Sequence, residues 1–194
     1  MTSEVYRSDK LTSEEYPSFS KVPRWNREIL VTEKIDGTNG MIYINPITNE
    51  IKAGSRNRWL SLGNDNYGFA LWVEKNKDFL IETLGHGHHY GEWWGQGIQR
   101  NYGLNHKRFS LFNVHRWKDI NGYDKANSID LYCVPTLWEG HLKEFTQGYI
   151  LRDLVYHGSY ACPYMNPEGI VILHKASGNL YKVTLEHDEK GKPD

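Results

Sequence analysis

The chain has 194 residues, of which 39% are hydrophobic, 24% charged and 13% aromatic. This is ordinary globular composition rather than that of a disordered or fibrous chain, and the length fits one domain with a sizeable core. The formal net charge of −1 excludes a protein that coats nucleic acid through a general basic excess, so any contact with a polynucleotide must be local.

The N-terminal part of the chain predicts a cytoplasmic protein that begins with short strands. Residues 1–21 are polar, and no later segment reaches the roughly 18 apolar residues of a membrane span, so no membrane partner is expected. Short apolar runs predict two strands within residues 28–44, around a turn at residues 37–40, and a third strand at residues 51–55. We expect these three strands to form an antiparallel meander.

The middle of the chain predicts one helix followed by two strands. Asn64 and Asp65 are candidate caps for a helix that extends to about residue 84, where apolar residues at helical spacing end before Gly85. Strand-like runs follow at residues 89–94 and 108–116.

The C-terminal part predicts a helix, a hairpin and a tail. The helix is expected near residues 141–155, and the hairpin pairs residues 169–174 with 180–185 around a turn at residues 177–179. The tail from residue 186 is charged, has no apolar periodicity and is expected to fray.

Cysteine and histidine usage does not indicate a metal cage or a disulfide. Cys133 and Cys162 stand alone in the sequence, and we expect two buried free thiols. His86 and His88 would share one face of an extended segment, but no third ligand stands at a fixed spacing, so a polar turn is favoured over a zinc site.

The strongest chemical signal is the run from Glu33 to Gly40. In an extended segment Lys34 and Asp36 point to one face while Glu33 and Ile35 point to the other. One face therefore combines an amine and a carboxylate just before a glycine-bearing turn. A surface lysine paired with a nearby acid would produce the same short pattern, so this run alone does not decide a function.

Two later acids and a second lysine add to this signal. Glu92 stands in an aromatic, strand-like setting, where a charge is costly unless something pairs with it. Glu168 directly precedes an apolar strand, and Lys182 alternates with its apolar neighbours Tyr181 and Val183. Two acids and two lysines at strand edges can surround one phosphate and its metal.

In this order the segments resemble the motifs of the covalent nucleotidyltransferases, the superfamily of ATP-dependent DNA ligases, RNA ligases and messenger-RNA capping enzymes. The resemblance extends over residues 28–184. It implies an α+β nucleotidyltransferase domain of the ATP-grasp-like type, with antiparallel sheets flanked by helices and the nucleotide pocket between the sheets. One such domain would account for residues 1–194, with no appended oligonucleotide-binding domain.

The resemblance implies a role for each matching residue. Lys34 would become adenylylated, Glu92 would bind the ribose, and Phe112 would stack on the base. The implied catalytic residues are Lys34, Asp36, Glu168 and Lys182. The implied nucleotide-binding residues are Glu33, Lys34, Asn39, Arg56, Glu92, Phe112, Glu168 and Lys182. Glu168 is also the implied contact for the metal cofactor, which would be Mg²⁺ or, as an alternative, Mn²⁺.

The residue two positions after Gly37 favours an RNA ligase. DNA ligases and capping enzymes usually carry Arg there, nick-sealing RNA ligases carry Asn, and this chain has Asn39. The implied substrates are ATP and RNA ends or a nicked RNA duplex, without a protein partner. Joining would pass through lysyl-AMP and adenylylated RNA.

Two alternatives stay open at this stage. One is a compact ATP-dependent DNA ligase or another nucleotidyltransferase, and the other is a non-catalytic nucleotide- or RNA-binding module of the same fold. The second is favoured by a departure in the last motif, usually Lys-x-Lys, where Leu180 replaces the first lysine. Lys175 is a candidate substitute.

Overall fold

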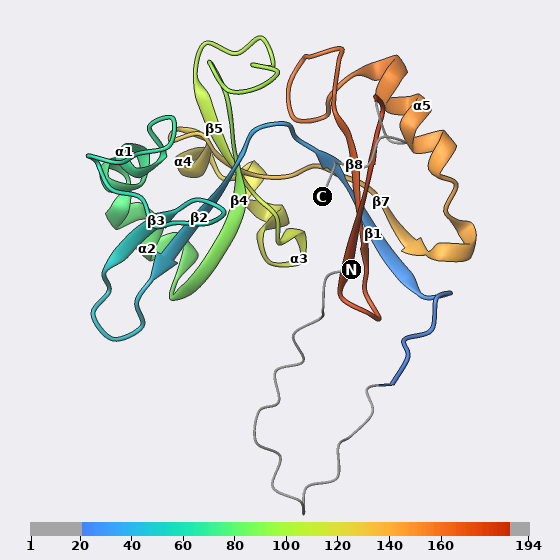
Figure 1. Ribbon diagram of the computed structural model, residues 1–194, viewed down its shortest axis with the longest axis horizontal. Coiled ribbons are helices and arrows are strands. Elements are labelled where there is room, and N and C mark those ends of the chain that lie inside the picture. The colour runs from blue at the N-terminus through green and yellow to red at the C-terminus, as the bar shows by residue number, and fades with distance from the viewer. Residues whose placement is uncertain (1–20, 187–194) are drawn as a thin grey trace, which may run out of the picture.

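The computed structural model of the chain describes residues 21–186. The polar N-terminal segment and the charged tail beyond residue 186 lie outside the described residues, apart from Lys21. Within the described range, strands form two sheets that stand side by side, with at least one helix on the outer side of each and α3 (Val114–Trp117) drawn between them (Figure 1). The expected α+β class is thereby confirmed.

The four-stranded sheet has the order β7-β1-β8-β9, and the five-stranded sheet has the order β3-β2-β4-β5-β6. All neighbouring strands are antiparallel except β5 and β6, which are parallel. The strands of the first sheet are β1 (Glu28–Lys34), β7 (Thr136–His141), β8 (Gly169–His174) and β9 (Asn179–Thr184). Those of the second are β2 (Thr38–Ile44), β3 (Ile51–Gly54), β4 (Gly87–Gly95), β5 (Lys107–Leu111) and β6 (Leu131–Cys133).

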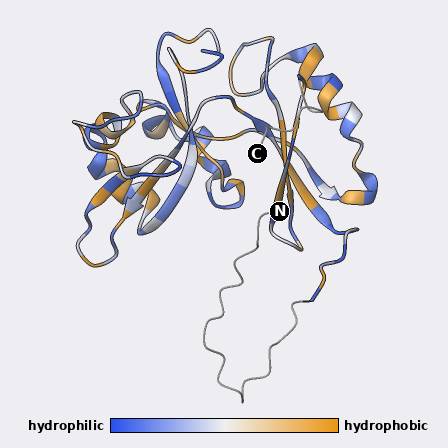
Figure 2. Ribbon diagram, viewed as in Figure 1, coloured by the Kyte–Doolittle hydropathy of each residue, from blue (hydrophilic) through white to orange (hydrophobic). Residues whose placement is uncertain are grey.

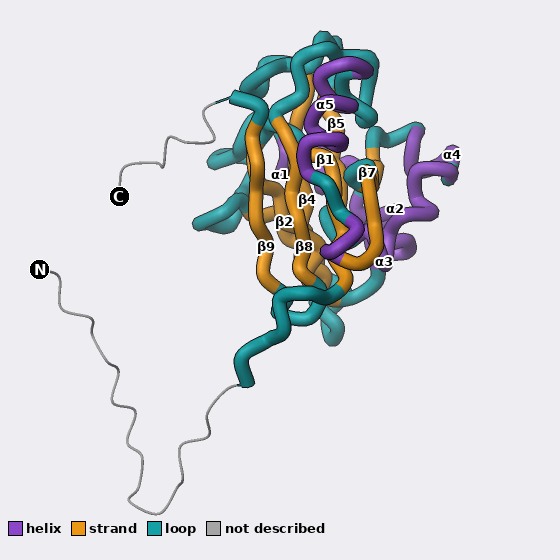
Figure 3. Tube along the Cα trace, turned by 90° about the vertical axis from the view of Figure 1, so that its right-hand side faces the viewer, coloured by secondary structure: helices purple, strands orange, loops and turns teal. Residues whose placement is uncertain are grey.

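The helices are short, apart from one that covers the four-stranded sheet. In Figure 3 this helix, α5, lies across the strands of that sheet. The α-helices are α1 (Phe69–Lys75), α2 (Lys77–Leu84), α3 (Val114–Trp117), α4 (Asp124–Asn127) and α5 (Gln147–His157). Two 3₁₀ helices are η1 (Lys118–Gly122) and η2 (Leu142–Glu144). Among the helices of residues 21–186, none is long and apolar enough to cross a membrane.

Each sheet buries its outer face in a separate core. Ile29 and Val31 of β1 pack with Leu154 of α5, so that the alternate residues of β1 face the other sheet. The larger core lies behind the five-stranded sheet, where Phe69 of α1 contacts its strands so closely that a Cβ on Gly40 would lie 2.8 Å from the Phe69 ring. Figure 2 shows apolar residues along the strands of both sheets and on parts of α5, and mostly polar residues in the loops.

The expected meander of the first three strands is wrong in one respect. β2 and β3 do pair, but β1 and β2 belong to different sheets. Residues 35–37 carry the chain from one sheet to the other, and the expected turn at residues 37–40 is mostly strand. Gly37 permits this crossing because a Cβ there would lie only 2.5 Å from the carbonyl oxygen of Trp93.

The single helix expected up to residue 84 is two helices. Asn76 separates α1 from α2 because its side-chain amide donates to the carbonyl of Trp72 at 2.8 Å, in competition with the helical ladder. The helical residues begin at Phe69 rather than at residue 64. Asp65 nevertheless caps α1, since its carboxylate accepts hydrogen bonds from the backbone N–H groups of Ala70 and Leu71.

Three further expectations need correction. The strand expected at residues 108–116 ends at Leu111, because Asn113 accepts a hydrogen bond from the backbone of Arg116 and starts α3. The helix expected at residues 141–155 begins only at Gln147, after strand β7 and the short η2. The expected polar turn before residue 89 is already strand, since β4 begins at Gly87. The C-terminal hairpin is confirmed, with Gly178 at a φ of 72° in its turn.

Candidate active site

Lys34 lies at the end of β1, where the four-stranded sheet faces its neighbour. Its Nζ lies 2.6 Å from Oε2 of Glu168, and the two side chains are 25% and 17% exposed. The sheet register explains this contact, because Lys34 pairs with Gly169 at the start of β8 and Glu168 directly precedes that glycine. The lysine and acid singled out in the sequence therefore form one ion pair.

Asp36 follows Lys34 at the crossing between the sheets. Its Oδ2 lies 3.2 Å from Nε of Arg100, and its backbone N–H donates to the hydroxyl of Tyr102 at 2.9 Å. Burial raises the pKa of Asp36, and the negative charge of Glu168 adds to this rise, whereas Arg100 and Lys34 oppose it. Sequence reasoning assigned no specific role to Tyr102, although a tyrosine in a glycine-rich loop is a usable sign of a hydroxyl contact.

Glu92 joins this group from the other sheet. Its carboxylate accepts hydrogen bonds from the backbone of Gly37 at 3.0 Å and from the Asn39 amide at 3.5 Å. The register of β2 and β4 pairs Asn39 with Glu92, which places both on the face opposite the core of that sheet. Burial raises the pKa of Glu92 to about 7, although Lys34 and the Gly37 N–H oppose the rise.

Glu33 is not part of this cluster. It is 1% exposed and lies on the α5 side of β1, where its Oε2 accepts hydrogen bonds from the backbone N–H groups of Tyr160 and Ala161. Burial raises its pKa, although the Ser159 side chain and these two backbone donors oppose the rise. Its other oxygen has no hydrogen-bond partner among the described residues.

Lys182 lies on β9 and reaches the same side of the sheet as Lys34. It pairs with Val171, whereas Lys34 pairs with Gly169, and positions two residues apart on a strand share a face. Lys182 is exposed and makes no hydrogen bond or ion pair within residues 21–186. Lys175, the candidate substitute for the missing first lysine of the last motif, instead contacts Glu28 and Glu139 at the far end of β1.

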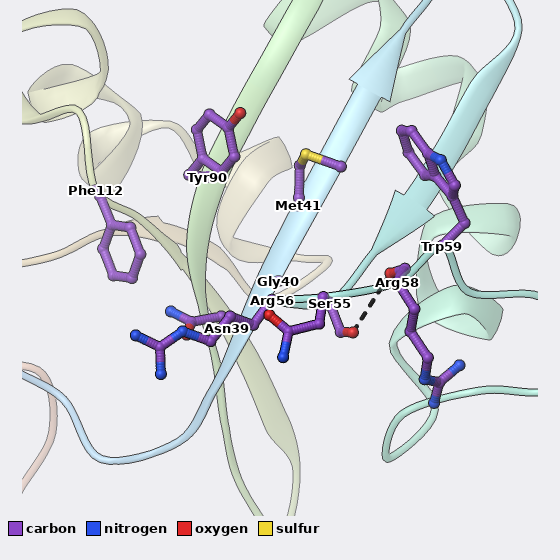
Figure 4. Close-up of a pocket in the computed structure, with 10 residues that line it drawn as sticks. Asn39, Gly40, Met41, Ser55, Arg56, Arg58, Trp59, Tyr90 and Phe112 are labelled. Carbon is purple, nitrogen blue, oxygen red and sulfur yellow. Dashed lines mark hydrogen bonds between the residues drawn. The ribbon is translucent and has the colours of Figure 1, made fainter. Parts of the chain in front are cut away.

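A cavity of about 550 Å³ adjoins this cluster on the inner face of the five-stranded sheet (Figure 4). Its walls are Asn39, Gly40, Met41, Ser55, Arg56, Asn57, Arg58, Trp59, Tyr90 and Phe112. Three predicted site residues, Asn39, Arg56 and Phe112, are therefore brought together. Lys34 does not line the cavity, and the link between the two groups is the contact of Asn39 with Glu92.

The two arginines at the cavity differ in what they contact. The guanidinium of Arg58 donates to the carbonyl groups of Asn64 and Asp65, at 2.8 and 3.2 Å, and points away from the cavity (Figure 4). Arg56 is exposed and makes no hydrogen bond or ion pair with another residue of the described range. Arg56 is therefore the arginine that is available to an anion in the cavity.

Two facing sheets, with a paired lysine and several acids where the chain crosses between them, form the arrangement expected for a nucleotidyltransferase domain. The RNA ligase family model matches residues 27–184, which is most of the chain. The protein belongs to the RNA ligase family. A comparison with curated proteins finds no match.

Several solved structures of Naegleria gruberi RNA ligase share the fold. An arginine-to-alanine mutant with ATP and Mn has a TM-score of 0.59 at 21% identity, covering 83% of this chain and 50% of that chain. A glutamate-to-alanine mutant with ATP and Mn has a TM-score of 0.59 at 22% identity, covering 87% and 53%. The same ligase with PPi has a TM-score of 0.57 at 20% identity, covering 82% and 50%. The chain thus spans about half the length of these structures.

Proposed function

We propose that the protein is an ATP-dependent RNA ligase that joins a 5′-phosphate to a 3′-hydroxyl. The observation that carries this proposal is the pairing of Lys34 with Glu168 at 2.6 Å, beside two acids from the crossing segment and the facing sheet. Membership of the RNA ligase family supports it, as does the shared fold of a ligase that binds ATP and Mn.

In the first step, the Lys34 amine attacks the α-phosphorus of ATP. A phosphorus–nitrogen bond forms, the bond from that phosphorus to the bridging oxygen breaks, and pyrophosphate leaves. An amine is a nucleophile only without its extra proton, and Glu168 lies within hydrogen-bond distance to accept that proton. Lys182, on the same sheet face, would stabilise the negative charge that spreads over the phosphates.

A divalent cation fits this site through Glu168 and the nucleotide phosphates. No group of three or more His, Cys, Asp or Glu side chains within residues 21–186 is arranged to hold a metal. Mg²⁺ does not require such a group, because it commonly binds through one or two carboxylates, substrate phosphates and water. When bound, Mg²⁺ or Mn²⁺ would neutralise charge on the phosphates.

The nucleoside would lie against the five-stranded sheet. Phe112 is 42% exposed in the cavity wall, so its ring face is available to stack on adenine. Glu92 has carboxylate oxygens that can accept a hydrogen bond from a ribose hydroxyl.

In the later steps AMP passes to RNA and then leaves. The RNA 5′-phosphate attacks the phosphorus of lysyl-AMP, which releases the Lys34 amine and forms a pyrophosphate link. The 3′-hydroxyl then attacks the 5′-phosphorus, so that a phosphodiester forms and AMP leaves with the electron pair of the broken bond. Asn39 and Arg56 would hold the 5′-phosphate, since both line the cavity and their side chains can donate hydrogen bonds to phosphate oxygens.

The reaction would take place in the cytoplasm, as expected from the sequence. The two thiols fit this location, because Cys133 and Cys162 are both buried and free.

Covalent labelling with radiolabelled ATP and Mg²⁺ tests the first step. Wild-type protein should retain acid-stable label, and Lys34→Ala should retain none. Lys175→Ala is the matched control, because Lys175 is equally exposed, at 25%, and is also paired with acids, but lies at the other end of β1. Label that persists in Lys34→Ala would overturn the assignment, and sealing of all-DNA nicks in preference to RNA would favour a DNA ligase.

A further inference from the structure

The inner face of the five-stranded sheet carries aromatic rings beyond the predicted adenine site, of which Tyr43 is half-buried and the others are exposed. Tyr43 lies opposite His88 in the register of β2 and β4, with ring centroids 4.6 Å apart. The rings of His88 and Tyr90 are stacked, with their planes 10° apart. The ring centroids of Trp59 and Tyr43 lie 6.0 Å apart. We call Tyr43, Trp59, His88 and Tyr90 the aromatic strip.

The aromatic strip begins at the cavity and continues away from the catalytic cluster. Trp59 and Tyr90 line the cavity and are 53% and 56% exposed. In Figure 4, Tyr90 and Trp59 lie beyond Asn39 along the strands. Tyr43 is four residues further along β2 than Asn39 on the same face, which corresponds to about 13 Å. The rings therefore extend the site by more than one side chain.

Two exposed cations lie on the same face of the sheet as the aromatic strip. Lys52 pairs with Tyr43 in the register of β2 and β3, so it emerges on the same face of the sheet, and Arg56 lines the same cavity as Trp59, near Asn39 (Figure 4). Both are exposed, and neither makes a hydrogen bond or ion pair with another residue in the described range. The face thus offers aromatic rings to bases and positive charges to the phosphates between them.

We propose that the aromatic strip binds unpaired RNA bases next to the end that is joined, with Lys52 at a phosphate between these bases and Arg56 at the terminal 5′-phosphate. This inference rests on the proposed function, which makes RNA the substrate. Bases stack on exposed aromatic rings without regard to sequence, and the faces of bases inside a duplex are already covered by their neighbours. The ligase would therefore favour ends that carry unpaired nucleotides. An apolar protein partner fits this face less well, because two uncompensated cations flank the rings.

Binding of a 5′-phosphorylated single-stranded RNA oligonucleotide, followed by fluorescence anisotropy, tests the inference. Tyr43→Ala and His88→Ala should each weaken binding about 5- to 100-fold, as expected for the loss of one stacked base. Tyr43→Phe and His88→Phe keep a ring and should bind nearly as wild type does. Tyr156→Ala is the matched control, because Tyr156 is 77% exposed on α5, on the opposite side of the molecule.

The same oligonucleotide annealed into a nicked duplex provides the second arm. Here the alanine variants should bind within about twofold of wild type, because paired bases have no free faces to stack on. Equal losses on both substrates would overturn the preference for unpaired bases. Unchanged binding of single-stranded RNA by both alanine variants would overturn the role of the aromatic strip altogether.

Covalent labelling with ATP separates this inference from the proposed function. Tyr43 and His88 do not line the cavity, so their alanine variants should label as wild type does. Normal labelling with unchanged RNA binding would refute the aromatic strip alone, whereas no labelling of wild-type protein would refute the proposed ligase. Lys52→Gln should also reduce the slope of log affinity against log salt by about 0.7, the contribution of one phosphate contact on a single strand. An unchanged slope would remove Lys52 from the site.

Discussion

Replacement of Glu92 by glutamine should remove a defined pH dependence of stability. Glu92 is 9% exposed, and burial raises its pKa from 4.5 to about 7. At a pH between these two pKa values, Glu92 therefore still carries a proton in the folded protein but has lost it in the unfolded chain. Because the folded state binds more protons there, the free energy of unfolding falls as pH rises through this window. The stabilising contribution of the neutral acid is fully present below about pH 4.5 and is lost above about pH 7.

The magnitude follows from the shift. At about 1.4 kcal/mol per pKa unit, the whole effect is about 3 kcal/mol, and most of it falls between about pH 5 and about pH 8. Glutamine has no charge to bury, and its carbonyl still accepts from the Gly37 N–H. The free energy of unfolding of wild type minus that of Glu92→Gln should therefore fall by about 2–3 kcal/mol across this interval.

Urea denaturation at the two pH values measures this difference. The subtraction matters because burial also raises the pKa of Glu33 and Asp36, and their contributions are shared by both proteins. Glu50→Gln is the control, since Glu50 is exposed and its replacement should change stability little at either pH. A difference between wild type and Glu92→Gln that stays constant from about pH 5 to about pH 8 would refute the reasoning.

Three further predictions concern the cavity and the sheet. Phe112→Ala should raise the ATP concentration for half-maximal labelling about 5- to 100-fold, with unchanged circular dichroism, and an unchanged concentration would move adenine elsewhere. Asn39→Ala and Arg56→Ala should each slow sealing of pre-adenylylated nicked RNA about ten- to a hundredfold, whereas wild-type rates would exclude a 5′-phosphate contact. Gly169→Ala should lower the free energy of unfolding by about 1–3 kcal/mol, because the residue has a φ of 155° and a Cβ would lie 2.1 Å from the Val183 carbonyl oxygen. An unchanged urea midpoint would contradict this.

The sequence predicted the local elements best where the turn chemistry was clear. Apolar strand segments and short turns predicted the C-terminal hairpin and the pairing of β2 with β3, and the structure has both. The prediction that β1 and β2 pair was wrong at Gly37. A glycine there is equally compatible with a turn between two paired strands and with a crossing from one sheet to the other. The prediction of a single helix was wrong at Asn76, because a competing side-chain hydrogen bond leaves no mark on the spacing of apolar residues.

The chemistry of the site was partly readable in the same way. Lys34, Glu92 and Glu168 stand out because a charged residue beside an apolar strand costs free energy unless a partner compensates the charge. The contacts of Arg100 and Tyr102 with Asp36 could not be predicted, because both residues reach Asp36 from a loop without strand or helix periodicity. Glu33 precedes Lys34 in the same sequence motif but lies outside the cluster around Lys34. The alternation of side chains along β1 directs Glu33 toward the loop after α5.

The sequence by itself determined which side chains share a face of each strand, because that alternation depends only on backbone geometry. It therefore determined that Lys34 and Glu33 point to opposite sides. Only the tertiary structure decided which acids surround the lysine, because Glu168 lies 134 residues away in the chain and Glu92 meets the backbone of Gly37 across 55 residues. Such contacts depend on which strands pair and in which register, and the burial that this pairing creates raises the pKa of Glu92.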